Sequence, residues 1–283
     1  MLFLGGFATS VRAFELTEFA RTTRRRLHLR TISVERNGFG ATPLDTTLGI
    51  DDAVEDMLTV LDLLGLDRVV VVAFSGGGPF AAAFAARVPE RVISLHLAAA
   101  AAGSLIAESP GAAALAQQTA AFAADPAALW RFPDDSPVHQ IPGFDRAAAA
   151  EGERALAPGG DGAAAMAHEW RLLCRAPPPR LGHLRAPAYL YHGTRDTTVP
   201  PAHTQAWHAT LGGPVTLRLY DGEAHDVQYR HWDQILVDAA GRGSQTLICA
   251  QKAVLVSADE AEEAARGQAT FGLCAWRPSP AQR

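Results

Sequence analysis

Three residues of this chain are of the types that together activate a hydroxyl group as a nucleophile. They are a serine, a histidine and an aspartate, and each lies just after an apolar run. Ser75 ends the run in VVVVAFS, Asp196 follows AYLYHG, and His225 follows VTLRLY. A serine hydroxyl is a poor nucleophile until a histidine takes its proton, and the histidine needs a carboxylate to hold its tautomer. The residues therefore predict Ser75 as nucleophile, His225 as base and Asp196 as the acid that orients the histidine.

Such a nucleophile also needs hydrogen-bond donors that stabilise the oxyanion formed when it attacks a carbonyl group. Ser75 lies where an apolar strand meets an alanine-rich helix, so the Gly76 N–H at the helix start is one candidate donor. The loop Gly5-Gly6-Phe7 follows another apolar run, and the Phe7 N–H is the second candidate. No cofactor and no metal is needed for this chemistry, and no CxxC spacing predicts a metal site.

Short apolar runs alternate with helical patterns along most of the chain. We expect strands at residues 2–4, 27–35, 68–74, 91–97, 188–192 and 215–220. We expect helices at residues 51–64, 75–87, 201–211 and 231–240. This alternation predicts an α/β fold with a mostly parallel, doubly wound sheet, whose carboxyl ends carry the site.

Two segments depart from that alternation. Residues 103–185 are alanine-rich helical pieces interrupted by prolines, which we interpret as a helical cap inserted into a core of residues 1–102 and 186–243. Residues 244–283 predict a small β-β-α-β appendage, in which Ser257 and Glu260 form a capping box. Cys249 and Cys274 could meet there as a disulfide, although buried free thiols are the default in a cytoplasmic protein.

The motifs LGGF, ERNGFGAT, VVAFSGGGP, HGTRDTTVP and GEAHD, in this order, resemble those of the α/β-hydrolase superfamily over roughly residues 1–240. The resemblance implies the same roles for Ser75, Asp196 and His225. The sequence departs from the family pattern at Ala73, Gly5 and Glu35, where glycine, histidine and aspartate are common. The family also has strands before the oxyanion loop, so we expect a shortened sheet edge, one rebuilt by the appendage, or a misplaced start.

The same residues also allow other interpretations. SGGGP lacks the lysine of a P-loop and the spacing of a dinucleotide site, which disfavours phosphate binding. Ser75 could be only a helix cap. His192 competes with His225 as the base, and Asp221 competes with Asp196 as the orienting acid.

The composition narrows the class of partner. The chain has a net charge of −5 and 19% charged residues, so it has no excess positive charge that would attract nucleic acid or an anionic membrane. The apolar start lacks a basic segment, and no run is long enough to span a bilayer. We therefore expect a cytoplasmic protein with a small-molecule substrate, and homo-oligomerisation stays open.

Together these observations predict hydrolysis of a carboxylic ester, thioester or lactone through an acyl-Ser75 intermediate. The same triad would serve an acyltransferase or a cofactor-free perhydrolase, and a hydrolase-like fold can also be a non-catalytic receptor. Phe74, Trp130 and Phe132 are the predicted lining of the substrate pocket. Activity should rise as His225 loses its proton, at a pH of about 6.5.

Overall fold

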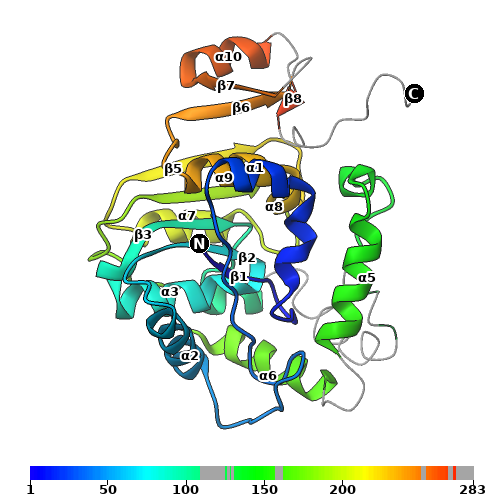
Figure 1. Ribbon diagram of the computed structural model, residues 1–283, viewed down its shortest axis with the longest axis vertical. Coiled ribbons are helices and arrows are strands. Elements are labelled where there is room, and N and C mark those ends of the chain that lie inside the picture. Colours follow the sequence, from blue (N-terminus) through cyan, green and yellow to red (C-terminus); the bar gives the residue numbers. More distant parts are fainter. Residues whose placement is uncertain are drawn as a thin grey trace.

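A parallel sheet forms the centre of the protein, as the computed structural model shows (Figure 1). The structure describes residues 1–108, 125, 128, 131–156, 162–249, 253–266 and 270–271. Within these residues the sheet has five strands in the order β1-β2-β3-β4-β5. The strands are β1 (Leu2–Leu4), β2 (Val69–Phe74), β3 (Val92–Ala98), β4 (Ala188–Gly193) and β5 (Val215–Tyr220). The predicted fold class is confirmed.

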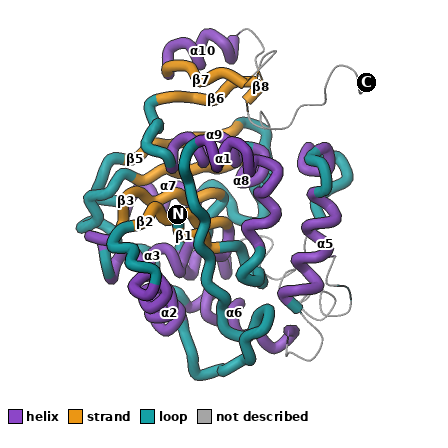
Figure 2. Tube along the Cα trace, viewed as in Figure 1, coloured by secondary structure: helices purple, strands orange, loops and turns teal. Residues whose placement is uncertain are grey.

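The alternation of side chains along β2 explains the two layers of helices. Val69, Val71 and Ala73 face one core, which is closed by α2 (Ile50–Leu63), α3 (Gly78–Arg87) and α7 (Ala202–Thr210). Val70, Val72 and Phe74 face the other, closed by the 3₁₀ helix Ala13–Ala20, α8 (Val227–Arg230) and α9 (Trp232–Ala239). Figure 2 shows the helices on both sides of the strands, with α1 (Arg21–Arg26) beside α9. A strand buried on both faces must be apolar throughout, as this one is.

One predicted strand is reduced to a single bridge. Residues 27–35 were expected to form a strand, but only Ile32 pairs with the sheet, in parallel with Leu2. His28 adopts the left-handed conformation, with φ at 56°, which is incompatible with an extended strand. The β-rich composition of the run is therefore not enough to extend the sheet edge.

The segment predicted as a helical cap contains several helices, joined by loops, where the structure describes it. It contains the 3₁₀ helices Gly103–Glu108 and Pro137–Gln140, followed by α5 (Phe144–Ala155) and α6 (Gly162–Arg175). α6 packs against the 3₁₀ helix Gly103–Glu108, and α5 packs against Ala13–Ala20. Residues 103–185 as a separate unit stay a prediction.

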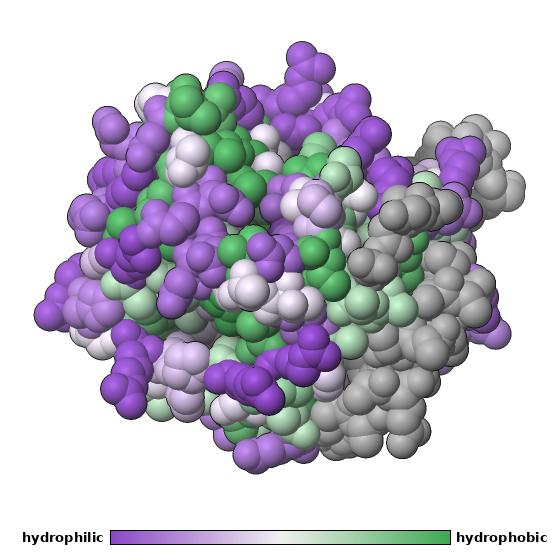
Figure 3. All heavy atoms as spheres, turned by 90° about the horizontal axis from the view of Figure 1, so that it is seen from below, coloured by the Kyte–Doolittle hydropathy of each residue, from purple (hydrophilic) through white to green (hydrophobic). Residues whose placement is uncertain are grey.

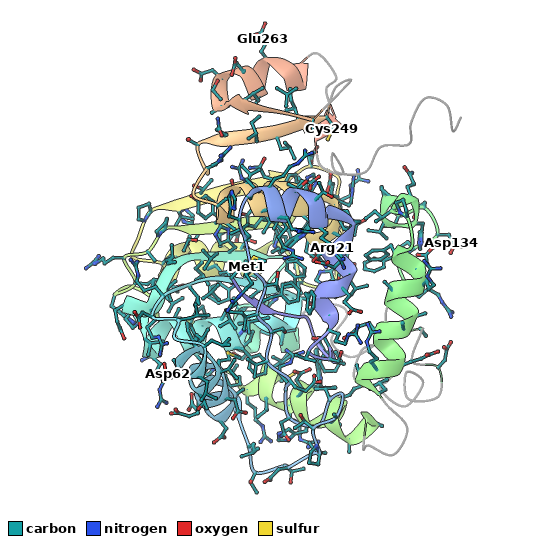
Figure 4. The ribbon with its side chains drawn as sticks, viewed as in Figure 1. Met1, Arg21, Asp62, Asp134, Cys249 and Glu263 are labelled. Atoms are coloured by element: carbon teal, nitrogen blue, oxygen red, sulfur yellow. The ribbon has the colours of Figure 1, made fainter. Side chains whose placement is uncertain are left out.

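The appendage has the predicted order of elements: β6 (Gln245–Cys249), β7 (Ala253–Ser257), α10 (Ala258–Arg266) and β8 (Thr270–Phe271). Its strands form their own antiparallel sheet in the order β7-β6-β8, so the appendage does not rebuild the edge of the main sheet. The Ser257–Glu260 capping box is present. Cys249, at the end of β6 (Figure 4), is disulfide-bonded, so the expectation of a free thiol there is wrong; Cys274 lies outside the described residues.

The surface seen from below in Figure 3 intersperses hydrophobic and hydrophilic side chains over the described residues. Among those residues, no helix is both long enough and apolar enough to cross a bilayer.

Candidate active site

Ser75 sits on a sharp turn between β2 and α3. Its φ is 46°, in the left-handed region, which costs a non-glycine residue about 1–2 kcal/mol. The 3₁₀ turn Ser75–Gly77 leads directly into α3, and the Ala101 N–H donates to the Ser75 carbonyl oxygen at 2.9 Å. This strained turn raises the Ser75 side chain above the carboxyl end of the sheet, as expected for a nucleophile.

The turn fits only because the residues after Ser75 lack side chains. A Cβ on Gly77 would lie 2.7 Å from the carbonyl oxygens of Leu4 and Gly5. These are backbone atoms of β1 and its loop, which cannot rotate away. The close packing of β1 on this turn therefore requires glycine at position 77.

Replacing Gly77 by alanine should destabilise the fold by about 1–3 kcal/mol, since overpacking forces the backbone apart. Thermal unfolding followed by circular dichroism measures this as a lowered Tm. Gly182→Ala is the matched control, because a Cβ there meets no atom within 4 Å. Equal Tm values for Gly77→Ala and Gly182→Ala would contradict the packing argument.

Ser75, His225 and Asp196 lie in one hydrogen-bonded row. The His225 Nε2 is 3.0 Å from the Ser75 Oγ, and its Nδ1 is 2.7 Å from the Asp196 Oδ2. Asp196 Oδ1 accepts hydrogen bonds from the backbone N–H groups of Thr198 and Val199, at 2.9 and 2.8 Å. With Nδ1–H donating to the carboxylate, Nε2 is left to accept the serine proton.

The electrostatics suit a base and its orienting acid. Burial disfavours a charged His225, but the charge and hydrogen bond of Asp196, with the charge of Asp226, raise the pKa of His225 above 6.5. Burial also opposes a charged Asp196, but His225 and the backbone N–H of Val199 outweigh it and lower the pKa of Asp196. Asp196 is therefore ionised at neutral pH.

The two competing residues take other positions. His192 Nδ1 bonds with the Thr204 hydroxyl at 2.7 Å, and its Nε2 bonds with the Val199 carbonyl at 2.7 Å. His192 thus supports the Asp196 loop. Asp221 accepts a hydrogen bond from the Thr194 hydroxyl at 2.9 Å on the surface, whereas His225 bonds to Asp196.

The two predicted oxyanion donors are brought together beside Ser75. A Cβ on Gly76 would lie 2.8 Å from the Phe7 amide nitrogen, so the Phe7 and Gly76 backbones are in close contact. A Cβ on Gly6 would lie 3.3 Å from the Ser75 Cβ, which places the loop against the serine. The two predicted donors are thus neighbours beside Ser75, and their role in an oxyanion hole stays a prediction.

A cavity of about 760 Å³ opens over Ser75 and His225. Phe7, Phe74, Phe132 and Tyr229 form its aromatic wall. Phe74 is also a core residue, packed edge-to-face on Phe3 at 5.0 Å. Two of the residues predicted to line the substrate pocket, Phe74 and Phe132, thus line this cavity. The third, Trp130, lies outside the described residues.

Sequence reasoning missed a group of residues that follow His225 directly. Asp226, Gln228, Tyr229 and Arg230 line the same cavity from α8 and its N-cap. The sequence pattern predicts a helix only from residue 231, whereas α8 already begins at Val227, two residues after His225. Among the described residues, no cluster of three or more His, Cys, Asp or Glu side chains could hold a metal ion.

Comparison with known proteins extends the resemblance. Over 72 residues the chain is 42% identical to a 2-hydroxy-6-oxo-2,4-heptadienoate hydrolase of Pseudomonas putida F1; this stretch is 25% of the chain and 26% of that relative. An alpha/beta hydrolase fold protein from Nakamurella multipartita superposes with a TM-score of 0.61 at 23% identity, covering 85% of this chain and 91% of that one. The 2-hydroxy-6-oxo-6-phenylhexa-2,4-dienoate hydrolase from Rhodococcus sp. strain RHA1 superposes with a TM-score of 0.64 at 20% identity, covering 84% and 89%.

The family model described as alpha/beta hydrolase fold matches residues 1–231. This stretch holds the whole five-stranded sheet and every residue of the hydrogen-bonded row. The chain therefore belongs to the alpha/beta hydrolase fold family.

Proposed function

We propose that the protein hydrolyses a carboxylic ester, thioester or lactone through an acyl-Ser75 intermediate. One observation supports this most: the Ser75, His225 and Asp196 side chains form an unbroken hydrogen-bonded row that opens into a cavity. A structural serine has no need for a strained turn, a buried acid and a base at once. Together they are the parts of an activated nucleophile.

The reaction follows from this geometry. As the Ser75 Oγ attacks the carbonyl carbon, its proton passes to His225 Nε2, and the carbonyl oxygen becomes an oxyanion facing the Phe7 and Gly76 N–H groups. The tetrahedral intermediate then breaks the bond to the leaving alkoxide or thiolate, which takes the proton from His225. Water repeats the sequence on the acyl-serine, with His225 as base, and releases the carboxylic acid.

The cavity favours a small molecule with an apolar part. Phe7, Phe74, Phe132 and Tyr229 supply apolar surface to the cavity, whereas Asp135, Glu223 and Arg230 supply charged side chains to its lining. We expect the acyl chain or the alcohol part to contact the aromatic wall.

A second candidate substrate comes from the P. putida relative, named as a hydrolase of 2-hydroxy-6-oxo-2,4-heptadienoate. A compound of that name offers a ketone carbon for attack, without the heteroatom leaving group of an ester. The absorbance of such a dienoate falls when its conjugation is lost, so hydrolysis is directly measurable. Dienoate turnover above ester turnover would favour this candidate.

The test of the proposal uses p-nitrophenyl acetate and butyrate, together with a fluorophosphonate probe that labels activated serines. We expect turnover of both esters and one probe per chain. Added alcohols or hydrogen peroxide compete with water if the enzyme is an acyltransferase or a perhydrolase. A folded protein that neither turns over esters nor reacts with the probe would contradict the proposal and favour a receptor.

The pH profile should show a rising limb with its midpoint above 6.5, because the pKa of His225 is raised from that value. Below this pKa the imidazole is protonated and cannot accept the serine proton, so activity grows as pH rises through it. This revises the midpoint predicted from the sequence. Profiles of kcat/KM for p-nitrophenyl butyrate measure it.

Asp226→Asn tests the cause of that raised pKa. Removing the negative charge of Asp226, which helps to raise the pKa of His225, should move the rising limb to lower pH. A limb that stays in place in this variant would contradict the contribution of Asp226 to the pKa of His225, and native activity that falls with rising pH would contradict His225 as the base.

A further inference from the structure

The loop that carries Phe7 is held by a buried arginine outside the hydrogen-bonded row. Arg36 is 8% exposed, and its guanidinium group donates to the Gly6 carbonyl oxygen. It also donates to the Gly5 carbonyl oxygen at 3.3 Å and to the Thr9 hydroxyl at 2.8 Å. The Thr9 hydroxyl in turn donates to the Gly6 oxygen at 3.0 Å. The Gly6 carbonyl thus has two donors, one of them a full positive charge.

This contact bears on the oxyanion hole through the geometry of one peptide unit. The Gly6 C=O and the Phe7 N–H belong to the same planar peptide group, and in the trans form they point in opposite directions. Holding the Gly6 oxygen on Arg36 therefore turns the Phe7 N–H away from Arg36. A Cβ built on Gly76 would lie 2.8 Å from the Phe7 nitrogen, and one built on Gly6 would lie 3.3 Å from the Ser75 Cβ, so this peptide packs against the turn that carries the serine.

The positive charge has a second effect on the same peptide. A cation hydrogen-bonded to a carbonyl oxygen polarises the amide, which makes its N–H a stronger donor. Arg36 thus both aims and strengthens the Phe7 N–H.

A buried carboxylate, that of Glu169, contacts both Arg36 and the loop that carries Phe7. Glu169 of α6 is 3% exposed; its Oε1 lies 3.1 Å from Arg36 Nε, and its Oε2 accepts from the Ala8 N–H at 2.7 Å. Ala8 has a φ of 55°, so it holds a strained left-handed conformation that this contact stabilises. Trp170 of the same helix packs edge-to-face on the Phe7 ring at 5.6 Å.

We propose that Arg36 is a positioning residue for the oxyanion hole, and that the Arg36–Glu169 pair ties the Phe7 loop to helix α6. This inference rests on the proposed function, since it concerns the step in which the oxyanion forms. Arg36 is not among the residues that line the cavity over Ser75, so it acts through the Gly6–Phe7 peptide.

The test compares Arg36→Lys and Arg36→Met with native protein in p-nitrophenyl butyrate hydrolysis. Arg36→Met should lower kcat by about 10²–10³-fold, the effect of losing one oxyanion donor, with little change in KM. Arg36→Lys keeps the charge but lacks the planar guanidinium group that reaches both the Gly5 and Gly6 carbonyls. Its kcat should therefore lie between that of native protein and that of Arg36→Met. Arg87→Met, which removes an exposed arginine paired with Glu55, is the control and should keep the native kcat.

A second readout separates positioning from general loss of structure. A trifluoromethyl ketone forms an oxyanion on Ser75, so its affinity should fall by the same factor as kcat, whereas a neutral ester analogue should bind as before.

Because Arg36→Met leaves Glu169 buried without its cation, Arg36→Met/Glu169→Gln is the second variant; its glutamine oxygen still accepts from the Ala8 N–H.

The outcomes are distinct. Folded Arg36 variants that keep the native kcat, or that lose kcat without losing trifluoromethyl ketone affinity, would overturn the positioning role while ester hydrolysis stands. Native protein that neither hydrolyses esters nor reacts with the fluorophosphonate would overturn the proposed function, and this inference with it.

Discussion

Replacing Ser75 by alanine is expected to lower kcat for p-nitrophenyl butyrate by about 10⁶-fold, since loss of the nucleophile removes the acyl-enzyme route. The Ser75 Oγ is the group within 3.0 Å of His225 Nε2, so alanine leaves the base nothing to activate. The fold should persist, because a smaller side chain fits the turn. Fluorophosphonate labelling should vanish with the activity.

Ser257→Ala is the control for that experiment. Ser257 is exposed in the appendage and bonds to Glu260, away from the cavity, so its loss should leave kcat and labelling unchanged. A Ser75→Ala protein that is folded and still labelled would place the reactive serine elsewhere.

Replacing Asp196 by asparagine is expected to lower kcat by about 10⁴-fold while the cavity keeps its shape. The asparagine amide can present its N–H₂ group to His225 Nδ1, which then accepts. His225 Nε2 becomes the protonated nitrogen and cannot take the serine proton. Steady-state kinetics at a pH above the rising limb measure the loss without interference from His225 protonation.

Asp221→Asn is the matched control, because Asp221 was the competing acid and contacts Thr194 instead. It should keep the native kcat within a few-fold. A large loss in Asp221→Asn together with a small loss in Asp196→Asn would show that Asp221, not Asp196, orients His225.

Much of the fold was predictable because its signals are local. The run at residues 69–74 is apolar at every position, which only a strand buried on both faces requires, and β2 occupies it. The run at residues 27–35 has similar β propensity, yet the left-handed His28 and the absence of further pairing reduce it to one bridge. Propensity does not reveal whether a neighbouring strand will pair.

The hydrogen-bonded row was predictable from the sequence for a different reason. Each of its residues follows a strand, and parallel strands bring their carboxyl ends to one edge, so Ser75, Asp196 and His225 had to converge. The support of the Phe7 loop was not predictable. Arg36 and Glu169 are far apart in sequence and follow no periodic pattern, and only the folded α6 brings the carboxylate to the arginine.

The pocket shows the same limit. Phe74 and Phe132 were predicted from their apolar character to line the substrate pocket, and both line the cavity. Tyr229 and Arg230 were not, because their role depends on α8 turning back past His225.

The central claim is an acyl-Ser75 intermediate, and rapid-quench mass spectrometry tests it most directly. Protein mixed with p-nitrophenyl butyrate and quenched in acid within milliseconds should carry one butyryl group, mapped by peptide sequencing to Ser75. The adduct should appear with the burst of p-nitrophenol and should be absent from Ser75→Ala. Steady ester turnover without an adduct, or an adduct on another residue, would contradict the account.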